Sequence, residues 1–166
     1  MENAAERIDA RFTTHSEFEE GDERYVVQST PFEITVTFSV ETGDSIEYLV
    51  EATVPSLDAV IVEESISDSL LEGWAEPFER RLRDVEQAWS SMSDVIVECD
   101  WDRDEFIASF RFSRVSDAPA PTDDIVALVG YLEGTYLQGI IPGYEYSEPV
   151  SGMLEQARDR AEESFE

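Results

Sequence analysis

The chain has 166 residues, and 39 acidic against 11 basic side chains give it a formal net charge of −28. This length corresponds to one domain, which we expect to span 1–166, and 42% hydrophobic residues suffice for a folded core. The acidic balance leaves no basic stripe to release counterions from a phosphate backbone, and no apolar run approaches the roughly 20 residues of a bilayer span, so we expect neither nucleic-acid binding nor a membrane segment.

The charged residues predict a salt-rich environment. All 11 basic residues are arginine, and the acids are dispersed along the whole chain. Dispersed surface acids repel one another, and this repulsion becomes tolerable when the Debye length falls to about 3 Å at 1 M salt. Because the N-terminus also lacks a secretion signal, we expect a cytoplasmic protein of a salt-accumulating halophile, most simply a haloarchaeon.

The first half of the chain predicts a helix followed by strands. Residues 5–12 (AERIDARF) carry apolar side chains at helical spacing. Residues 32–40 and 46–54 alternate apolar and polar side chains, which is typical of half-buried strands.

The pairing of these strands follows from the rule that apolar side chains share one face. Val40 then lies opposite Ile46, and residues 42–44 (TGD) form the hairpin loop. Upstream, Tyr25 is expected opposite Ile34, which completes a three-stranded antiparallel meander.

The strongest helical pattern in the chain lies between residues 71 and 89. The apolar stripe consists of Leu71, Trp74, Phe78, Leu82, Val85 and Trp89. Pro77 lies inside the stripe, so we expect a kink there or a new helix that begins near Glu76.

Two further helices are predicted near the C-terminus. One has Thr122 as its N-cap and runs to about Gly139. Gly130 and Gly134 lie one turn apart in it, and we expect them to let another element approach closely, because glycine otherwise weakens a helix. A closing amphipathic helix is marked by Val150, Leu154, Ala157, Ala161 and Phe165.

Residues 98–106 (ECDWDRDEF) place aspartates at alternate positions, as the start of a calcium loop does. These aspartates are Asp100, Asp102 and Asp104. Such a loop needs glycine at its sixth position and a bidentate glutamate at its twelfth, but these positions hold Glu105 and Arg111. The stretch is better explained as the tip of a hairpin between two strands, 94–101 and 105–112.

The register of this second hairpin follows from the same rule. Val97 is expected opposite Ala108, which makes Asp102 and Arg103 the two turn residues. Cys99 then points to the apolar face as a buried, unreactive thiol.

The elements follow the order α-β-β-β-α-β-β-α-α, which predicts an α+β fold. Hairpins dominate, so we expect a five-stranded antiparallel sheet with helices packed on one face. This element order resembles the secretion-chaperone topology, a curved sheet with helices on one side. The opposite face of the sheet is mostly polar, but it carries three apolar residues, Leu49, Ile96 and Ile107.

Few residues suggest catalysis. His15 is the only histidine, no G-x-S-x-G motif occurs, and Cys99 is the only cysteine, which excludes an internal disulfide and a multi-cysteine zinc site. Metal-binding patterns of His and Cys do not occur, and without lysine there is no phosphate-binding P-loop. We therefore expect no catalytic residue, no cofactor and no dedicated metal ligand.

The tyrosine-rich turn at 136–149 is the most distinctive segment. Tyr136, Tyr144 and Tyr146 cluster there among glycines and prolines. An aromatic loop of this kind is consistent with a ligand or partner site. We favour the other interpretation, a helix–helix connection whose tyrosines seal the edge of the core.

Four stretches resemble a family of small haloarchaeal proteins known only as a conserved domain of unknown function. They are RFTTHSEFE (11–19), TPFEITVTF (30–38), EGWAEPFERRL (72–82) and EGTYLQGIIPGYEYSEPVSG (133–152). The resemblance covers nearly the whole chain and implies a halophilic cytosolic protein. It provides no catalytic residue.

These observations favour a non-enzymatic protein-interaction or chaperone-like adaptor domain. Leu49, Ile96 and Ile107 on the polar sheet face suggest a surface for a protein partner or a homodimer. The alternative is a small-ligand binder or enzyme that uses the tyrosine-rich turn at 136–149.

Overall fold

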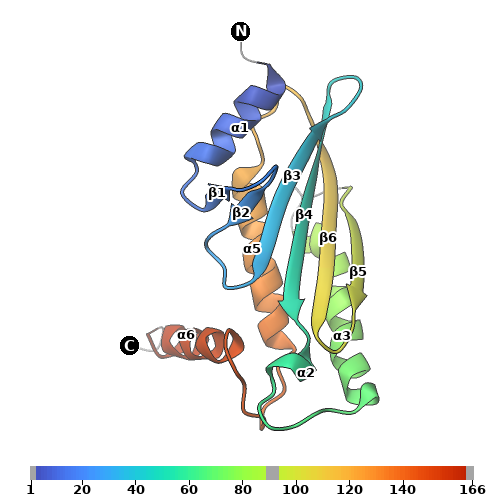
Figure 1. The fold of residues 1–166 in the computed structure, drawn as a ribbon, viewed down its shortest axis with the longest axis vertical. Helices are drawn as coiled ribbons and strands as arrows, with labels where there is room; N and C mark the ends of the chain where they lie inside the picture. The colour runs from blue at the N-terminus through green and yellow to red at the C-terminus, as the bar shows by residue number, and fades with distance from the viewer. Residues whose placement is uncertain (1–2, 89–93, 164–166) are drawn as a thin grey trace.

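The computed structural model describes residues 3–88 and 94–163, which form an α+β fold (Figure 1). Its strands are β1 (Phe18–Glu20), β2 (Tyr25–Val27), β3 (Glu33–Val40), β4 (Ser45–Pro55), β5 (Ile96–Trp101) and β6 (Glu105–Val115). Its helices are α1 (Ala4–Thr14), α2 (Leu57–Val60), α3 (Asp68–Arg83), α4 (Val85–Ala88), α5 (Thr122–Gln138) and α6 (Val150–Glu163).

All strands belong to one antiparallel sheet with the order β1-β2-β3-β4-β6-β5. The antiparallel α+β class is therefore confirmed, but the expected number of five strands is wrong, because β1 adds a sixth. Strand β1 has three residues with one apolar side chain, so it shows no alternation. The four-residue helix α2 was missed because it is too short for a helical period. The single helix expected over 71–89 is divided at Asp84 into α3 and α4.

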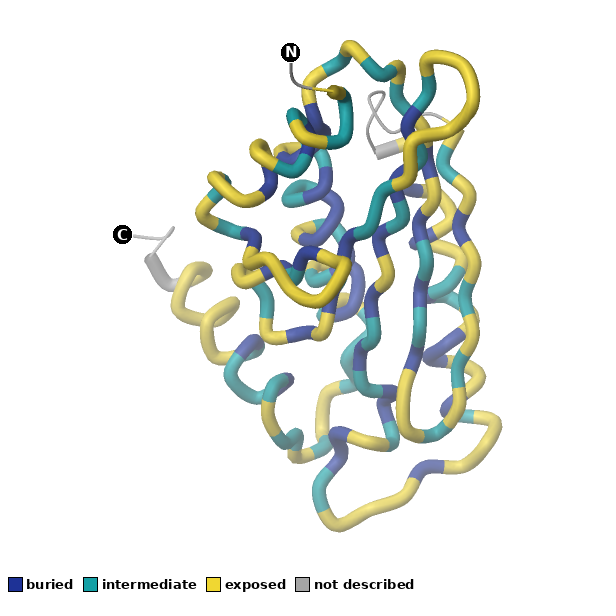
Figure 2. Tube along the Cα trace, turned by 45° about the horizontal axis from the view of Figure 1, so that its top comes forward, coloured by how far each residue is buried: buried dark blue, intermediate teal, exposed yellow. Residues whose placement is uncertain are grey.

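Helices α1, α3 and α5 pack against one face of the sheet (Figure 1). An aromatic ring of each helix packs against an aromatic ring on the side of the sheet. The distances between ring centroids are 4.5 Å for Phe12 and Tyr25, 4.7 Å for Phe78 and Phe106, and 5.0 Å for Tyr136 and Phe32. Figure 2 shows the buried residues alternating along the central strands, as a sheet covered on one side requires. The expectation of helices on one face is confirmed.

The register of the first hairpin is confirmed, because Val40 pairs with Ile46. The register predicted for β2 against β3 is wrong by two residues, since Tyr25 pairs with Val36 and not with Ile34. A shift of two residues keeps every side chain on its face, so the alternation pattern does not distinguish the two registers.

The register predicted for the second hairpin, β5 against β6, is also wrong by two residues. Val97 pairs with Phe110 and not with Ala108, and Trp101 pairs with Phe106. The turn is accordingly centred one residue later than expected, between Arg103 and Asp104.

Two details of the helices differ from expectation. Pro77 lies within α3, which runs unbroken from Asp68 to Arg83, so no new helix begins near Glu76. The buried residues Trp74 and Phe78 flank the proline and hold the helix on the core. Thr122 is the first residue of α5 and not its N-cap, which is Pro121, and the buried Thr122 hydroxyl has no hydrogen-bond partner among the described residues. The predicted stripe residue Trp89 and the predicted Phe165 lie outside the described residues.

The expected role of two glycines in α5 is wrong. A Cβ atom at Gly130 or Gly134 would meet nothing within 4 Å, and both residues are exposed. The close approach occurs instead at Gly139, where a Cβ would lie 3.2 Å from Trp74 Nε1.

Candidate interaction surface

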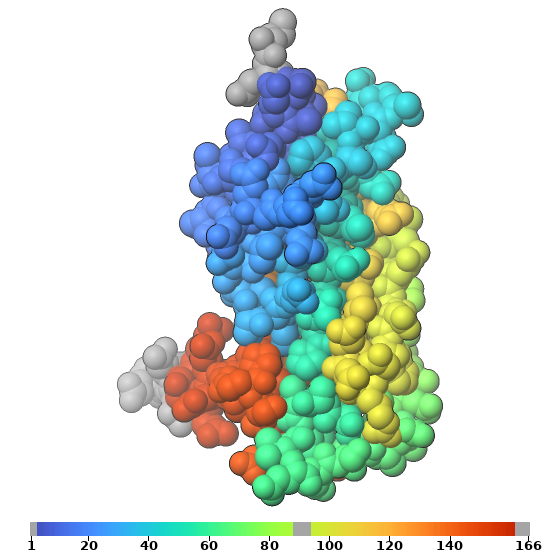
Figure 3. Space-filling view, in the orientation of Figure 1, coloured from blue at the N-terminus to red at the C-terminus, as the bar shows by residue number. Residues whose placement is uncertain are grey.

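The sheet face opposite the helices carries all three apolar residues singled out from the sequence. We call it the open face; Figure 3 views the molecule from this side. Its central residues are Glu33, Thr35, Thr37, Glu47, Leu49, Glu51, Thr53, Ile96, Glu98, Asp100, Ile107, Ser109 and Arg111, and the same face continues toward its ends with Val26, Ser39, Ser45, Glu105, Ser113 and Val115. Five carboxylates against one guanidinium make the central part of this face acidic.

One row of the open face crosses three strands and brings two predicted residues near each other. Leu49 on β4 pairs with Arg111 on β6, which in turn pairs with Ile96 on β5. Leu49 is half-buried, whereas the side chain of Ile96 is 58% exposed. Arg111 Nε lies 3.4 Å from Glu47 Oε1, so the cation between the two apolar residues is already partly neutralised.

The third predicted residue, Ile107, lies in a different row. It pairs with Thr53 on one side and Asp100 on the other, and it is half-buried. The row between it and Arg111 contains Ser109 flanked by two glutamates. The apolar side chains are therefore separate contacts within a charged surface and do not form one continuous patch.

The tyrosine-rich turn is held by internal hydrogen bonds. The hydroxyl of the buried Tyr136 donates to Pro55 O at 2.8 Å, and burial raises the pKa of this phenol. The hydroxyl of Tyr146 donates to Ile141 O at 2.6 Å, and its oxygen accepts from the Ile141 N–H at 3.1 Å. Tyr144 is half-buried against the core. These contacts make Tyr136 and Tyr146 structural residues of the turn.

A cleft of about 460 Å³ lies next to this turn, between α6, α5 and the β2–β3 loop. Leu137, Glu148 and Pro149 from the 136–149 segment line it, together with Arg160 of α6. The three tyrosines are not among its lining residues. Its volume lies in the range of small-molecule sites.

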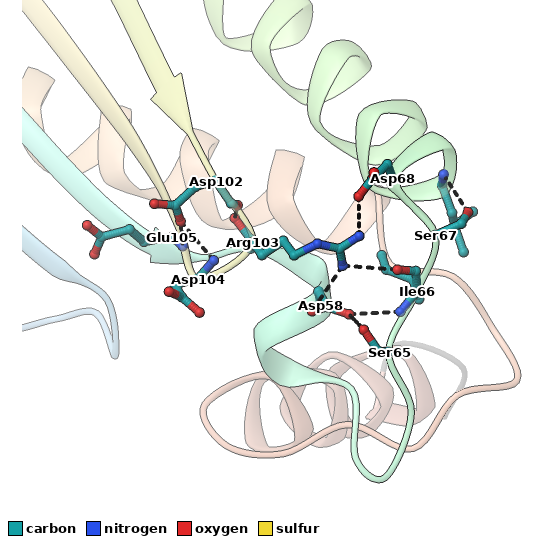
Figure 4. Close-up of polar contacts among 11 residues, drawn as sticks. Asp58, Ser65, Ile66, Ser67, Asp68, Asp102, Arg103, Asp104 and Glu105 are labelled. Carbon is teal, nitrogen blue, oxygen red and sulfur yellow. Dashed lines mark hydrogen bonds and ion pairs between the residues drawn. The ribbon is translucent and has the colours of Figure 1, made fainter.

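The aspartate-rich hairpin tip is engaged in an ion-pair cluster, which we call the Arg103 cluster (Asp58, Ile66, Asp68 and Arg103; Figure 4). Arg103 Nη1 lies 3.3 Å from Asp58 Oδ2 and donates to Ile66 O at 3.0 Å. Its Nη2 pairs with Asp68 Oδ1. The cluster ties the β5–β6 turn to α2 and to the start of α3.

The turn itself uses the carboxylate of Asp102 as a backbone acceptor. Asp102 Oδ1 accepts the N–H groups of Glu105 at 2.9 Å and Asp104 at 2.8 Å, and these bonds lower the pKa of the carboxyl group (Figure 4). Ser56 fastens the other side of the tip, because its hydroxyl donates to Asp102 O. Of the alternating aspartates, Asp102 therefore stabilises the hairpin turn through its side chain.

The Arg103 cluster was missed by sequence reasoning, which placed Arg103 only in the turn. A usable signal was present, because Arg103 is the single basic residue in a very acidic stretch. Its partners lie far away in the chain, however, and sequence spacing alone does not identify them.

Cys99 lies on the apolar face as expected, but it is only partly buried. Cys99 is half-buried on the covered side of β5, and burial raises its pKa to about 12, with a further contribution from the charge of Glu79. His15 Nε2 lies 3.5 Å from Asp123 Oδ1, and its Nδ1 accepts the Glu17 N–H, so it joins the end of α1 to the start of α5.

A sequence model of one protein family matches residues 13–156 of the chain. The chain belongs to the DUF5813 family of unknown function. Neither a curated protein nor a solved structure matches it. The expectation from the sequence that the chain belongs to a family of unknown function is thus confirmed.

The match to the DUF5813 family includes the open face, the Arg103 cluster and the tyrosine-rich turn. In the described part of the chain, no helix has both the length and the apolar character needed to cross a membrane. Among residues 3–88 and 94–163, no group of three or more His, Cys, Asp or Glu side chains converges in a metal-binding arrangement.

Proposed function

We propose that the chain is a non-catalytic protein-interaction domain, adapted to high salt, that binds a partner protein on the open face. The observation that carries this proposal is the asymmetry of the sheet, whose helices cover one face and leave Leu49, Ile96 and Ile107 on the other. A non-obligate interface is, as a whole, only about as apolar as the rest of a protein surface, so apolar side chains on a largely polar face are compatible with one.

The polar chemistry of the molecule also favours binding over catalysis. The phenols of Tyr136 and Tyr48 and the thiol of Cys99 have raised pKa values because they are buried, so they stay protonated at neutral pH. A thiol or phenol that acts as a nucleophile or base requires a lowered pKa instead.

The sheet with helices on one side also fits a chaperone-like adaptor of the kind that the secretion-chaperone topology suggests. The net charge of −28 with no lysine fits a cytoplasmic haloarchaeal protein, because charge repulsion at this level is relieved by molar salt.

Capture from a native lysate at high salt tests the proposed function. The immobilised protein is compared with Ile107→Asp on the open face and with Gln138→Asp at an exposed position on α5. A partner retained by the native protein and by Gln138→Asp, but lost with Ile107→Asp, supports the proposal. Equal retention by all three proteins, or retention of nothing, contradicts it.

A second candidate function is supported by the cleft beside α6, whose volume and mixed lining suit a small ligand. Thermal unfolding in the presence of a panel of metabolites tests it. A ligand that raises the melting temperature of the native protein but not of Ala157→Leu, which enlarges an exposed side chain in the lining of the cleft, supports this function. An unchanged melting temperature across the panel contradicts it.

A further inference from the structure

Strand β5 ends the sheet order, so within the described residues it has a neighbouring strand on one side only. Figure 1 shows this edge along the right of the sheet, with α3 behind it. An edge strand exposes backbone groups that can pair with another chain.

The backbone direction at this edge is fixed by one contact. Arg83 Nη1 on α3 donates to the carbonyl of Val97 at 2.7 Å, so this carbonyl points away from β6. In an antiparallel ladder alternate residues point the same way, so Cys99 and Trp101 also direct their N–H and C=O groups outward. In the described part of the chain these four groups, and the N–H of Val97, have no hydrogen-bond partner.

The side chains along the edge have two different characters. Ile96, Glu98 and Asp100 are exposed and lie on the open face, whereas Val97, Cys99 and Trp101 lie on the covered face. A strand added here would place its own side chains alternately beside two carboxylates and beside this apolar row.

A second copy of the chain does not suit this edge. Two β5 strands related by a twofold axis at Cys99 would place Glu98 opposite Asp100 of the copy, twice over. Centred one residue earlier, Glu98 would lie opposite its own equivalent. Like charges directly opposite destabilise a strand pair, and the net charge of −28 adds repulsion between the two molecules.

We propose that the β5 edge binds an extended segment of a partner protein as an additional strand, and that this segment alternates Lys or Arg with small apolar residues. The basic side chains contact Glu98 and Asp100, and the backbone pairs with Cys99 and Trp101. Charge contacts of this kind persist at high salt only between neighbouring groups, because the Debye length at 1 M is about 3 Å. The inference rests on the proposed function and specifies the partner's chemistry.

A synthetic peptide that alternates Lys and Val tests the inference by calorimetry with the full chain at about 1 M KCl. The control peptide has the same charges but carries N-methyl groups on alternate amides, which block strand pairing. The protein variant Glu98→Arg with Asp100→Arg reverses the charge of the edge. Its matched control, Glu155→Arg with Asp159→Arg, makes the same charge change on the exposed side of α6.

The inference predicts binding by the native protein and by the α6 control variant, with affinity at least about tenfold lower for the edge variant and for the N-methylated peptide. Equal affinity for both peptides means that binding is charge attraction alone, and it overturns the inference. A dimer that Val97→Pro dissociates also overturns it, because the occupant is then a second copy. Capture of a partner that depends on Ile107 but not on Glu98 and Asp100 overturns the edge inference and leaves the proposed function standing.

Discussion

Arg103 Nη1 lies 3.3 Å from Asp58 Oδ2, and this ion pair fastens the β5–β6 hairpin to helix α2. The same Asp58 carboxylate accepts the Ile66 N–H at 2.8 Å through its other oxygen. One largely buried carboxylate therefore holds both the tip of the hairpin and the loop that leads into α3 (Figure 4).

The first prediction concerns the two carboxylates of the Arg103 cluster. Asp58 is 17% exposed and Asp68 is 87% exposed. Asp58→Ala leaves the Ile66 N–H without its acceptor, and we expect the free energy of unfolding to fall by about 1–3 kcal/mol. Asp68→Ala removes only an exposed pair, so the expected loss is at most about 1 kcal/mol. Urea denaturation measures both, and equal losses would contradict the role given to burial.

The second prediction uses the glycines of α5. Gly134→Ala adds a methyl group into open space on an exposed helical position, so we expect stabilisation by about 1 kcal/mol. Gly139→Ala has an ordinary right-handed backbone but places its methyl group against the buried Trp74 indole, so we expect destabilisation. Melting temperatures that change in the same direction for both variants would contradict the packing described around Trp74.

The third prediction separates the tyrosines of the 136–149 turn. Tyr136→Phe removes the hydroxyl that donates to Pro55 O, and we expect the free energy of unfolding to fall by about 1–2 kcal/mol. Tyr144→Phe serves as the control, because the hydroxyl of this half-buried tyrosine has no hydrogen-bond partner in the described part of the chain, and the stability of the variant should be unchanged. Chemical denaturation of both variants measures the difference; a larger loss for Tyr144→Phe would argue against a structural role for Tyr136.

The fourth prediction concerns Cys99 and pH. Burial raises the thiol pKa from 9.0 to about 12, so the folded protein favours the protonated thiol. The stabilisation is complete below pH 9 and is lost as the pH rises toward 12, because the unfolded chain loses its proton first. At neutral pH we expect alkylation of the folded protein to be at least about a hundredfold slower than in urea. Equal alkylation rates would show that the thiol is accessible and ionised.

The sequence predicted the first hairpin well because two constraints acted together. Apolar alternation set the faces of β3 and β4, and the short loop at 42–44 allowed only one pairing, that of Val40 with Ile46. For β5 and β6, alternation also set the faces, but two registers that differ by two residues keep the apolar side chains on the same face. The register was decided by the turn, where Asp102 accepts the backbone N–H groups that follow it.

The candidate surface was predictable in part. Leu49, Ile96 and Ile107 were placed on the polar face from alternation alone, and the structure puts them there. Their separation by Arg111 and Ser109 depends on the pairing of three strands, which the sequence does not specify. The Arg103 cluster depends on contacts between distant loops, and these arise only once the sheet and α2 are packed.

Residue-specific photo-crosslinking tests the proposed interaction surface most directly. A photoreactive amino acid replaces Ile107 on the open face in one protein and Gln138 on the solvent side of α5 in another, and both are irradiated in native lysate at high salt. If the open face binds a partner, a recurring protein is attached through position 107 and not through position 138. Equal labelling from both positions, or labelling only from position 138, would contradict an interaction domain that uses this face.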